Sequence, residues 1–255
     1  MRLNGKVCAI TGGGAGIGGA ASRLFAQQGA HVIILELNES HGRDTQAAIS
    51  AAGGNATYLH CNVADEQSVH SAFETIGTRF NRLDVLYNNA SVFLSKEDGP
   101  VADLETEVWR KILSINLDSV FFCCRNGIPL MIRGGGGSVI NTASSAALIG
   151  IPECDAYTAT KGATLAMTRS MAVEYGPQKI RVNCIAPAAI DTAMLRESSI
   201  GNSNFDERAF FSKAPLSRYG TAEEIAQVAL FLASDESSYL NGTVVVADGG
   251  ITIRG

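Results

Sequence analysis

Short apolar segments alternate with longer amphipathic segments along the whole chain of 255 residues. Most of the short segments are apolar at every position and rich in β-branched residues, which is typical of parallel strands buried on both faces. They lie at residues 7–11, 31–35, 57–61, 84–87, 138–141, 181–185 and 243–246. The segments between them predict helices, for example at 18–28, 67–79, 108–132, 157–175 and 223–233. This alternation predicts an α/β fold with a doubly wound parallel sheet of about seven strands flanked by helices.

Several predicted helices carry capping signals at their ends. Asp65 precedes one helix, and Thr221 with Glu224 three residues later forms a capping box before another. Gly29 and Gly176 lie at predicted C-terminal ends. The glycine tract at 134–137 predicts a turn that leads into a strand. No linker or internal repeat interrupts the pattern, so we expect a single domain over residues 1–255.

The composition argues against several classes of protein. The net charge is −5, only 18% of residues are charged, and no basic run is present, so we expect no nucleic-acid partner. No segment approaches the roughly 18 apolar residues of a membrane span, and no signal peptide opens the sequence. The six cysteines lack CxxC spacing, and Cys8, Cys61 and Cys184 lie in apolar strand-like segments. They indicate reduced core residues in a cytoplasmic protein without a metal site.

A glycine-rich loop follows the first predicted strand, with the sequence Thr-Gly-Gly-Gly-Ala-Gly-Ile-Gly-Gly at residues 11–19. Glycines let the backbone approach a pyrophosphate, and the following helix N-terminus offers free N–H groups. Two motifs fit the loop: GxxxGxG at Gly12, Gly16 and Gly18, and GxGxxG at Gly14, Gly16 and Gly19. Both predict a Rossmann-type dinucleotide site.

Glu36 ends the second predicted strand, twenty residues after Gly16. A carboxylate at this position can accept hydrogen bonds from both hydroxyls of an adenosine ribose, and it repels a 2′-phosphate. Residues 35–40 include no Arg or Lys. We therefore expect NAD rather than NADP as the cofactor; the alternative is that Glu36 is an ordinary solvated strand end.

Tyr157 and Lys161 are four residues apart on a predicted helix, so their side chains share one face. An ammonium about 4 Å from a phenol favours the phenolate by roughly 4 kcal/mol at an effective dielectric near 20. This corresponds to about three pKa units, which brings a tyrosine pKa from about 10 towards neutrality. Such a phenol can take a proton from an alcohol or return one to a carbonyl. The alternative is a chance pairing on a surface helix.

With Ser144 thirteen residues before Tyr157, the chain resembles the short-chain dehydrogenase/reductase (SDR) family over essentially its whole length. Residues 11–18 match the family motif TGxxxGxG, which favours Gly12, Gly16 and Gly18. Residues 88–90 match the start of its NNAG motif, residues 187–192 match its PGxxxT loop, and residues 247–250 resemble its DGG motif. The resemblance implies a dinucleotide-binding half at 1–142. Residues 143–255 then supply a catalytic helix, a substrate lid near 193–217 and the last strand.

The resemblance also implies a catalytic tetrad of Asn116, Ser144, Tyr157 and Lys161. Tyr157 is then the general acid/base, Lys161 lowers its pKa and holds the nicotinamide ribose, Ser144 binds the substrate oxygen, and Asn116 supports a water-linked proton path. Ser145 is the rival for the serine role but lacks the thirteen-residue spacing. The implied cofactor contacts are Gly12, Gly16, Ile17, Gly18, Glu36, Asn62, Val63, Asn89, Ala90, Tyr157, Lys161, Pro187, Ile190 and Thr192.

Three positions depart from the family pattern. Asn62 replaces an aspartate common at the adenine, and its carbonyl can still pair with the adenine amino group. Ser91 and Ala188 replace glycines, which costs roughly 1 kcal/mol or more at each position if the backbone requires positive φ. We expect an adjusted cofactor geometry without loss of chemistry.

The sequence predicts hydride transfer between NAD and a secondary alcohol or ketone, but it leaves the substrate open. Acidic residues before the catalytic helix suggest sugars and polyols. Aromatic residues in the lid suggest an apolar or ring substrate, and basic residues in the lid suggest an acid group on the substrate. The residues concerned are Glu153, Cys154 and Asp155 in the first segment, and Arg196, Phe205, Arg208, Phe210, Phe211 and Lys213 in the lid. The alternatives are an NADPH-linked 3-oxoacyl reductase and a non-catalytic, NAD-binding, redox-responsive scaffold.

Two long predicted helices carry more apolar residues than one side of a sheet can cover. The residues are Val108, Ile112, Val120, Phe121 and Phe122 on the first, and Ala163, Leu165, Ala166, Met167 and Met171 on the second. Ile251 and Ile253 add apolar surface at the C-terminal end. We expect a homotetramer, with a dimer as the alternative.

Overall fold

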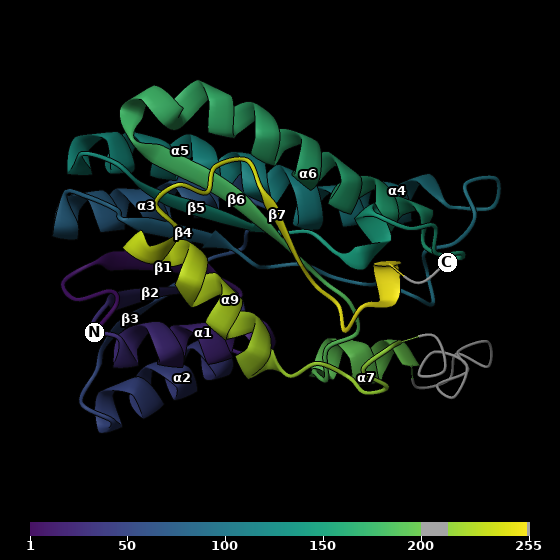
Figure 1. The fold of residues 1–255 in the computed structure, drawn as a ribbon, viewed down its shortest axis with the longest axis horizontal. Helices are drawn as coiled ribbons and strands as arrows, with labels where there is room; N and C mark the ends of the chain where they lie inside the picture. Colours follow the sequence, from purple (N-terminus) through teal and green to yellow (C-terminus); the bar gives the residue numbers. More distant parts are fainter. Residues whose placement is uncertain (200–213, 254–255) are drawn as a thin grey trace.

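The computed structural model describes residues 1–199 and 214–253 and places a sheet at the centre of the molecule (Figure 1). The sheet has seven parallel strands in the order β3-β2-β1-β4-β5-β6-β7. The chain reverses its direction of travel across the sheet between β1 and β4, which is the point where such folds bind ligands at the carboxyl ends of the strands. The predicted α/β fold is confirmed.

All seven predicted strands are present, with ends that differ from the prediction by at most two residues. They are β1 (Val7–Thr11), β2 (His31–Glu36), β3 (Asn55–His60), β4 (Val85–Asn88), β5 (Gly137–Thr142), β6 (Ile180–Pro187) and β7 (Val244–Ala247). Every residue of β1 is buried, because helices cover both faces of the sheet. This burial explains why the strands are apolar without alternation.

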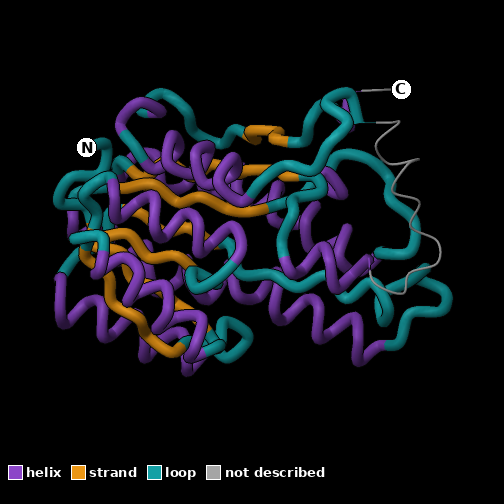
Figure 2. Tube along the Cα trace, turned by 90° about the horizontal axis from the view of Figure 1, so that it is seen from below, coloured by secondary structure: helices purple, strands orange, loops and turns teal. Residues whose placement is uncertain are grey.

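Helices form a layer on each face of the sheet (Figures 1 and 2). One layer has α1 (Gly16–Gln27), α2 (Glu39–Ala51) and α9 (Ala222–Ala233), and the other has α3 (Glu66–Phe80), α4 (Thr106–Leu113), α5 (Ser119–Gly134) and α6 (Asp155–Tyr175). The short helix α7 (Ala193–Ser199) follows β6 and lies at the same end of the molecule as α4 (Figure 1). The predicted helices do not include α2. Only Gly42, Thr45 and Ile49 of this helix are buried, so its apolar pattern is short.

The helix predicted at 108–132 is present, but it is not α-helical throughout. A π-helical segment, Ser114–Asp118, separates α4 from α5. Its wider turn buries Asn116, which is 2% exposed, and π-helical segments of this kind are frequent at functional sites.

Most of the predicted caps are confirmed. The Asp65 side chain accepts a hydrogen bond from Gln67 N, and Thr221 forms the capping box before α9. Gly29 has φ +89° after α1. Gly176 lies at the C-terminal end of α6 as predicted, but its φ of −54° is not left-handed, and it opens a 3-10 turn that Pro177 continues. The left-handed residue is Lys179 instead.

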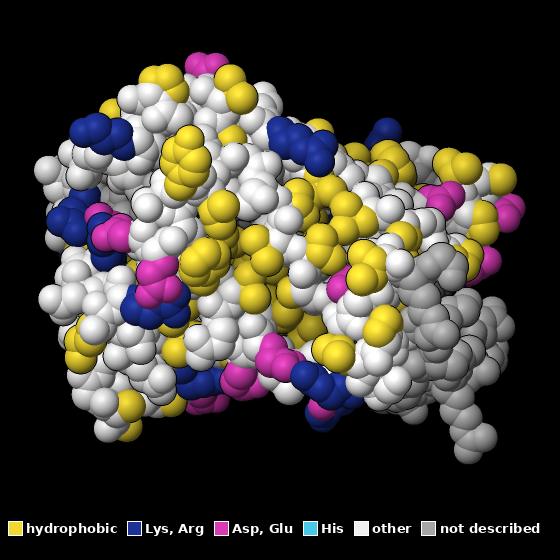
Figure 3. Space-filling view, viewed as in Figure 1, with side chains coloured by type: hydrophobic (Ala, Val, Ile, Leu, Met, Phe, Trp, Pro, Cys, Tyr) yellow, Lys and Arg dark blue, Asp and Glu magenta, His cyan; other side chains and the backbone are white. Residues whose placement is uncertain are grey.

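The apolar surface of the long helices is smaller than predicted. Ile112, Val120 and Leu165 are buried within the chain itself, because α4, α5 and α6 pack against each other and against the sheet. Phe121 remains 48% exposed and Val173 is 81% exposed. Apolar side chains also gather at the centre of the face shown in Figure 3, where Figure 1 places β7.

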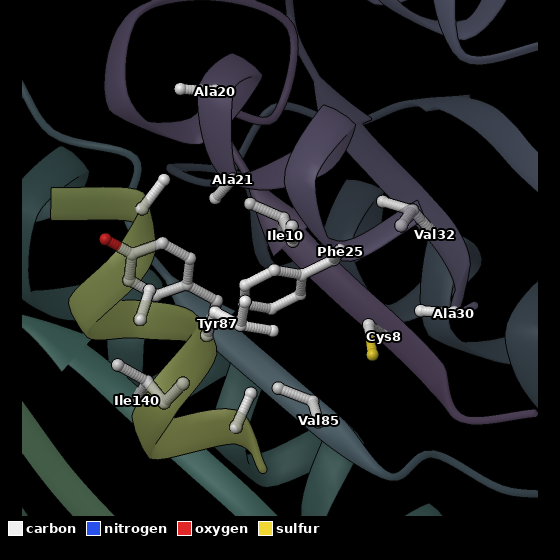
Figure 4. Packing of buried hydrophobic residues seen from close by; sticks show 14 of the residues in the cluster. Cys8, Ile10, Ala20, Ala21, Phe25, Ala30, Val32, Val85, Tyr87 and Ile140 are labelled. Carbon is white, nitrogen blue, oxygen red and sulfur yellow. The ribbon is translucent and has the colours of Figure 1, made fainter. Parts of the chain in front are cut away.

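Two apolar cores lie on the two faces of the sheet. One packs α1 and α9 against the strands, and Figure 4 shows the rings of Phe25 and Tyr87 within it, together with Ile10 and Ile140. The other packs α3, α5 and α6 against the opposite face. All six cysteines are buried and free, in agreement with the prediction of reduced core residues. Within residues 1–199 and 214–253, no helix is long and apolar enough to cross a membrane.

Candidate active site

The glycine loop makes a tight turn between β1 and α1. Gly12 and Gly16 have φ values of +60° and +51°, which favour glycine. A Cβ at Gly18 would overlap the carbonyl oxygen of Gly12 and the side-chain nitrogen of Asn89. Helix α1 begins without a side-chain cap from Ala15. The first N–H groups of the helix are therefore suited to an anion such as a pyrophosphate.

The end of β4 is joined to the glycine loop through Thr11. The Thr11 hydroxyl accepts hydrogen bonds from the backbone N–H groups of Asn89 (2.9 Å) and Ala90 (3.0 Å). The Asn89 side chain donates to the Thr11 carbonyl at 3.1 Å. The structure thus brings Gly12, Asn89 and Ala90 together at the switch point of the sheet.

Glu36 points its carboxylate at the glycine loop. One oxygen accepts from Gly14 N at 3.2 Å and the other from Asn38 N at 3.0 Å. Each carboxylate oxygen retains acceptor capacity for a ligand hydroxyl. Arg43, the basic residue nearest to Glu36 in the subsequent sequence, pairs with Glu39 at 2.7 Å and lies over the Tyr58 ring.

Asn62 and Val63 follow β3 at the far edge of the sheet. The Asn62 side-chain oxygen accepts from Ala64 N at 3.1 Å, so this carbonyl already has one partner. The Val63 side chain is 8% exposed and packs in the core. Ile17 is partly buried and packs against the opposite core. Any contact of Val63 with a cofactor is therefore made by its backbone.

Ser144 and Tyr157 meet at the carboxyl end of β5. The Ser144 hydroxyl lies close enough to the Tyr157 phenol to influence its pKa, and it accepts a hydrogen bond from Ala146 N at 3.2 Å. Ser145, the alternative serine, is 6% exposed and begins a 3-10 turn. Burial raises the pKa of Tyr157 to about 12, although the nearby Ser144 hydroxyl acts to lower it.

The pKa of Tyr157 is raised by burial in the structure, and the lowering by Lys161 towards neutrality stays a prediction. The Lys161 ammonium lies over the face of the Tyr157 ring, 5.4 Å from its centroid, and donates to the Thr142 carbonyl at 3.0 Å. Lys161 is 2% exposed, and this burial lowers its own pKa to about 8. The loss of water disfavours the charged forms of both side chains.

Asn116 holds the segment that follows β4. Its side-chain oxygen accepts from Val92 N at 2.8 Å, and its nitrogen donates to Val92 O at 2.9 Å. The same nitrogen lies 3.5 Å from the Thr160 hydroxyl, which donates to the Tyr157 carbonyl at 2.7 Å. The Asn116 side chain therefore links this segment to α6.

The loop after β6 lies beside the glycine loop. Pro187 ends β6, Ile190 is 6% exposed, and the Thr192 side chain lies 3.6 Å from the position of a Cβ on Gly16. Asp191 pairs with Arg196 at 2.8 Å. Arg196 is the one lid cation within the described residues, and its charge is already paired with Asp191.

The condition for strain at Ser91 and Ala188, a positive φ, is not met. Neither residue has a positive φ, so a side chain fits the backbone conformation at both positions. The other lid residues, Phe205, Arg208, Phe210, Phe211 and Lys213, lie outside the described residues.

Two residues that lie beside Tyr157 were not indicated by any sequence pattern. The Phe93 ring lies 4.9 Å from the Tyr157 ring, centroid to centroid, at an interplanar angle of 55°. Asp98 is 7% exposed and accepts hydrogen bonds from the backbone of Ala156 and Tyr157. Both lie in an irregular loop without periodicity; the only signal was an aromatic residue just after the Asn-Asn-Ala-Ser segment.

A doubly wound sheet with a glycine turn at its switch point, and a Ser–Tyr–Lys cluster beside β5, defines the class of dinucleotide-binding oxidoreductases. A family model described as enoyl-(acyl carrier protein) reductase matches residues 12–252. The chain belongs to the short-chain dehydrogenase/reductase family.

Individual relatives agree with this assignment. Cyclohexanol dehydrogenase of Acinetobacter sp. (strain SE19) is 35% identical over 253 residues, which cover 99% of this chain and 97% of the relative. A 3-oxoacyl-[acyl-carrier-protein] reductase of Thermotoga maritima is 37% identical over 256 residues, covering 99% and 100%. The crystal structure of levodione reductase has a TM-score of 0.93 and 35% identity, with 99% of both chains covered. The protein is accordingly an oxidoreductase that acts on CH–OH groups with a nicotinamide dinucleotide.

Proposed function

We propose that the protein is an NAD-dependent dehydrogenase of cyclic secondary alcohols that also reduces the corresponding ketones. The observation that carries this proposal is the cluster around Tyr157, in which Lys161 lies over its ring and Phe93 packs beside it, with the Ser144 hydroxyl close to the phenol. In this cluster a group that can transfer a proton, the Tyr157 phenol, lies next to an apolar surface for the substrate, the Phe93 ring.

In the direction of oxidation, the Tyr157 phenolate takes the proton of the substrate hydroxyl, and Ser144 orients that hydroxyl by a hydrogen bond. NAD, when bound at the glycine loop, would supply the acceptor for the hydride of the carbinol carbon. Lys161 holds the ribose of the cofactor and places positive charge at the phenol ring. Because the pKa of Tyr157 is raised to about 12, the fraction of phenolate increases with pH, and we expect the oxidation rate to increase as well.

The choice of NAD depends on Glu36. Its carboxylate faces the glycine loop, where an adenosine ribose would be bound, and it repels a 2′-phosphate. Arg43 is engaged with Glu39 and Tyr58, so it is poorly placed to counter this repulsion. The glycine turn, the uncapped start of α1 and Glu36 together fit the adenosine and pyrophosphate parts of the cofactor.

A cyclic, largely apolar substrate is favoured over a sugar or polyol. Phe93 offers an aromatic face next to Tyr157. Leu148, Ile151 and Met194 are each about 40% exposed, at 41%, 37% and 40%, in the segments that follow β5 and β6. Asp155, which we considered for hydroxyl recognition, is occupied by Val101 N at 2.8 Å. The relative named cyclohexanol dehydrogenase adds independent support.

The test is an absorbance screen at 340 nm with cyclic alcohols, open-chain alcohols, sugars and polyols, each with NAD and NADP. A 3-oxoacyl thioester with NADPH forms a separate arm. We expect turnover with cyclohexanol or cyclopentanol and NAD, and Tyr157→Phe should lower kcat at least about 100-fold while the protein still binds NADH. Faster turnover of the thioester with NADPH would show that the protein is instead a 3-oxoacyl reductase.

We also propose that the protein is a cytoplasmic homotetramer. Six free, buried cysteines suit a reducing compartment. Exposed apolar residues on three elements suit closed assembly: Phe121 on α5, Val173 on α6 and Val246 on β7.

A further inference from the structure

The first turn of helix α6 is capped by a loop from another part of the chain. Cys154 precedes the helix and provides no side-chain cap. Instead, the two carboxylate oxygens of Asp98 accept from Ala156 N at 3.1 Å and Tyr157 N at 2.9 Å. The carbonyl of Gly99 accepts from Asp155 N at 3.3 Å. The first three backbone N–H groups of the helix are therefore satisfied by residues 98 and 99.

The contact is reciprocal. The Asp155 carboxylate accepts from Val101 N at 2.8 Å, so each segment provides a carboxylate to the backbone of the other. The loop is also held near its start, where Asn116 forms two hydrogen bonds with Val92. Between these two attachments lies Phe93, whose ring packs on Tyr157.

We propose that Asp98 is a positioning residue for the alcohol–ketone reaction. Through the backbone of Tyr157 it sets the place of the phenol, and through its own loop it sets the place of Phe93. Tyr157, which transfers the proton, and Phe93, which lines the substrate site, are then both held in place by Asp98. This inference rests on the proposed role of Tyr157 as the acid/base.

The chemistry of the anchor requires a carboxylate. Asp98 has to satisfy three backbone donors, because Gly99 N also donates to it at 2.9 Å. Two anionic oxygens can do this, and their charge favours the N-terminus of a helix. An asparagine has the same shape but only one acceptor oxygen, and its NH₂ group would face an N–H donor. Asp98→Asn therefore displaces the first turn with little change in volume.

Asp84 is a matched control for a purely structural role. It is 8% exposed, close to the 7% of Asp98, and it accepts from Val7 N at 2.7 Å across the fold. It lies at the amino ends of the strands, at the opposite edge of the sheet from Tyr157. Asp84→Asn removes the charge of a buried backbone acceptor without touching the site.

The experiment compares wild type, Asp98→Asn, Asp84→Asn and Tyr157→Phe with the best cyclic alcohol from the screen and NAD. Circular dichroism gives the Tm, fluorescence titration gives the Kd of NADH, and steady-state assays well below each Tm give kcat and KM. We expect Asp98→Asn to lower kcat at least about tenfold, which equals about 1.4 kcal/mol, with the Kd of NADH within about twofold. Asp84→Asn should lower the Tm and keep kcat within about twofold of wild type.

If Asp98→Asn fails to fold, Asp155→Ala tests the same contact from its exposed side and should lower kcat about two- to fivefold at unchanged NADH affinity. A kcat within about twofold of wild type in the folded variant, or an equal loss in Asp84→Asn, overturns the positioning role. A Tyr157→Phe enzyme with a normal rate would instead overturn the proposed function itself.

Discussion

Lys161 makes the stability of the protein depend on pH in an unusual direction. The side chain is 2% exposed, and burial lowers its pKa from 10.5 to about 8. Between these two values the unfolded chain binds more protons at this position than the folded protein does. The free energy of unfolding therefore increases with pH in this window, and the destabilisation is fully present below pH 8.

The size of the effect follows from the two pKa values. Between pH 7 and pH 9.5, linkage predicts that this one group adds about 2 kcal/mol to the free energy of unfolding. Lys161→Met retains most of the side-chain volume and removes the titrating amine. It also removes the hydrogen bond to the Thr142 carbonyl, which changes stability by an amount that we expect to be independent of pH.

The measurement is urea unfolding of both proteins at pH 7, 8, 9 and 9.5 without the dinucleotide. The two titratable neighbours of Lys161, Cys184 and Tyr157, have folded pKa values of about 11 and about 12. Loss of the lysine charge can only raise these values, so both groups stay protonated in the folded proteins up to pH 9.5, and the difference between wild type and Lys161→Met reports on the lysine. We expect this difference to shift by about 2 kcal/mol in favour of wild type as the pH increases. A difference that stays constant, or shifts towards the variant, would refute the reasoning, because the folded protein would then stabilise the charged amine.

Three further predictions concern the cofactor site and the assembly. Glu36→Ala should narrow the preference for NAD over NADP, which we expect to be at least about tenfold in kcat/KM for wild type; an unchanged ratio in steady-state assays would contradict the role of Glu36. Gly18→Ala should lower the free energy of unfolding by about 1–3 kcal/mol and weaken NADH binding, because the added Cβ overlaps Gly12 and Asn89. Fluorescence titration and urea unfolding measure both effects, and normal NADH affinity would contradict the glycine requirement. Light scattering should find four chains of 26.8 kDa each in one particle; a monomer at micromolar concentration would exclude the proposed assembly.

Much of the fold was predictable because its determinants are local. The apolar, β-branched segments predicted all seven strands, since a strand buried on both faces needs apolar side chains at every position. The exception was the segment from 106 to 134, where a regular helical pattern hid the π-helical segment Ser114–Asp118. Within that segment the Asn116 side-chain oxygen accepts a hydrogen bond from Val92 N, a contact across 24 residues of chain that a periodic pattern cannot reveal.

The candidate site divides in the same way. The glycine turn, Glu36 and the spacing of Ser144, Tyr157 and Lys161 are properties of short sequence segments, and they suffice to indicate a dinucleotide and a proton-transfer pair. The contacts of Asp98 and Phe93 with Tyr157 join segments about 60 residues apart, so they exist only once the chain is folded. The pKa values follow the fold as well. Spacing along a helix indicated an attraction between Tyr157 and Lys161, but burial determines how strongly water stabilises each charge, and burial is a property of the packed molecule.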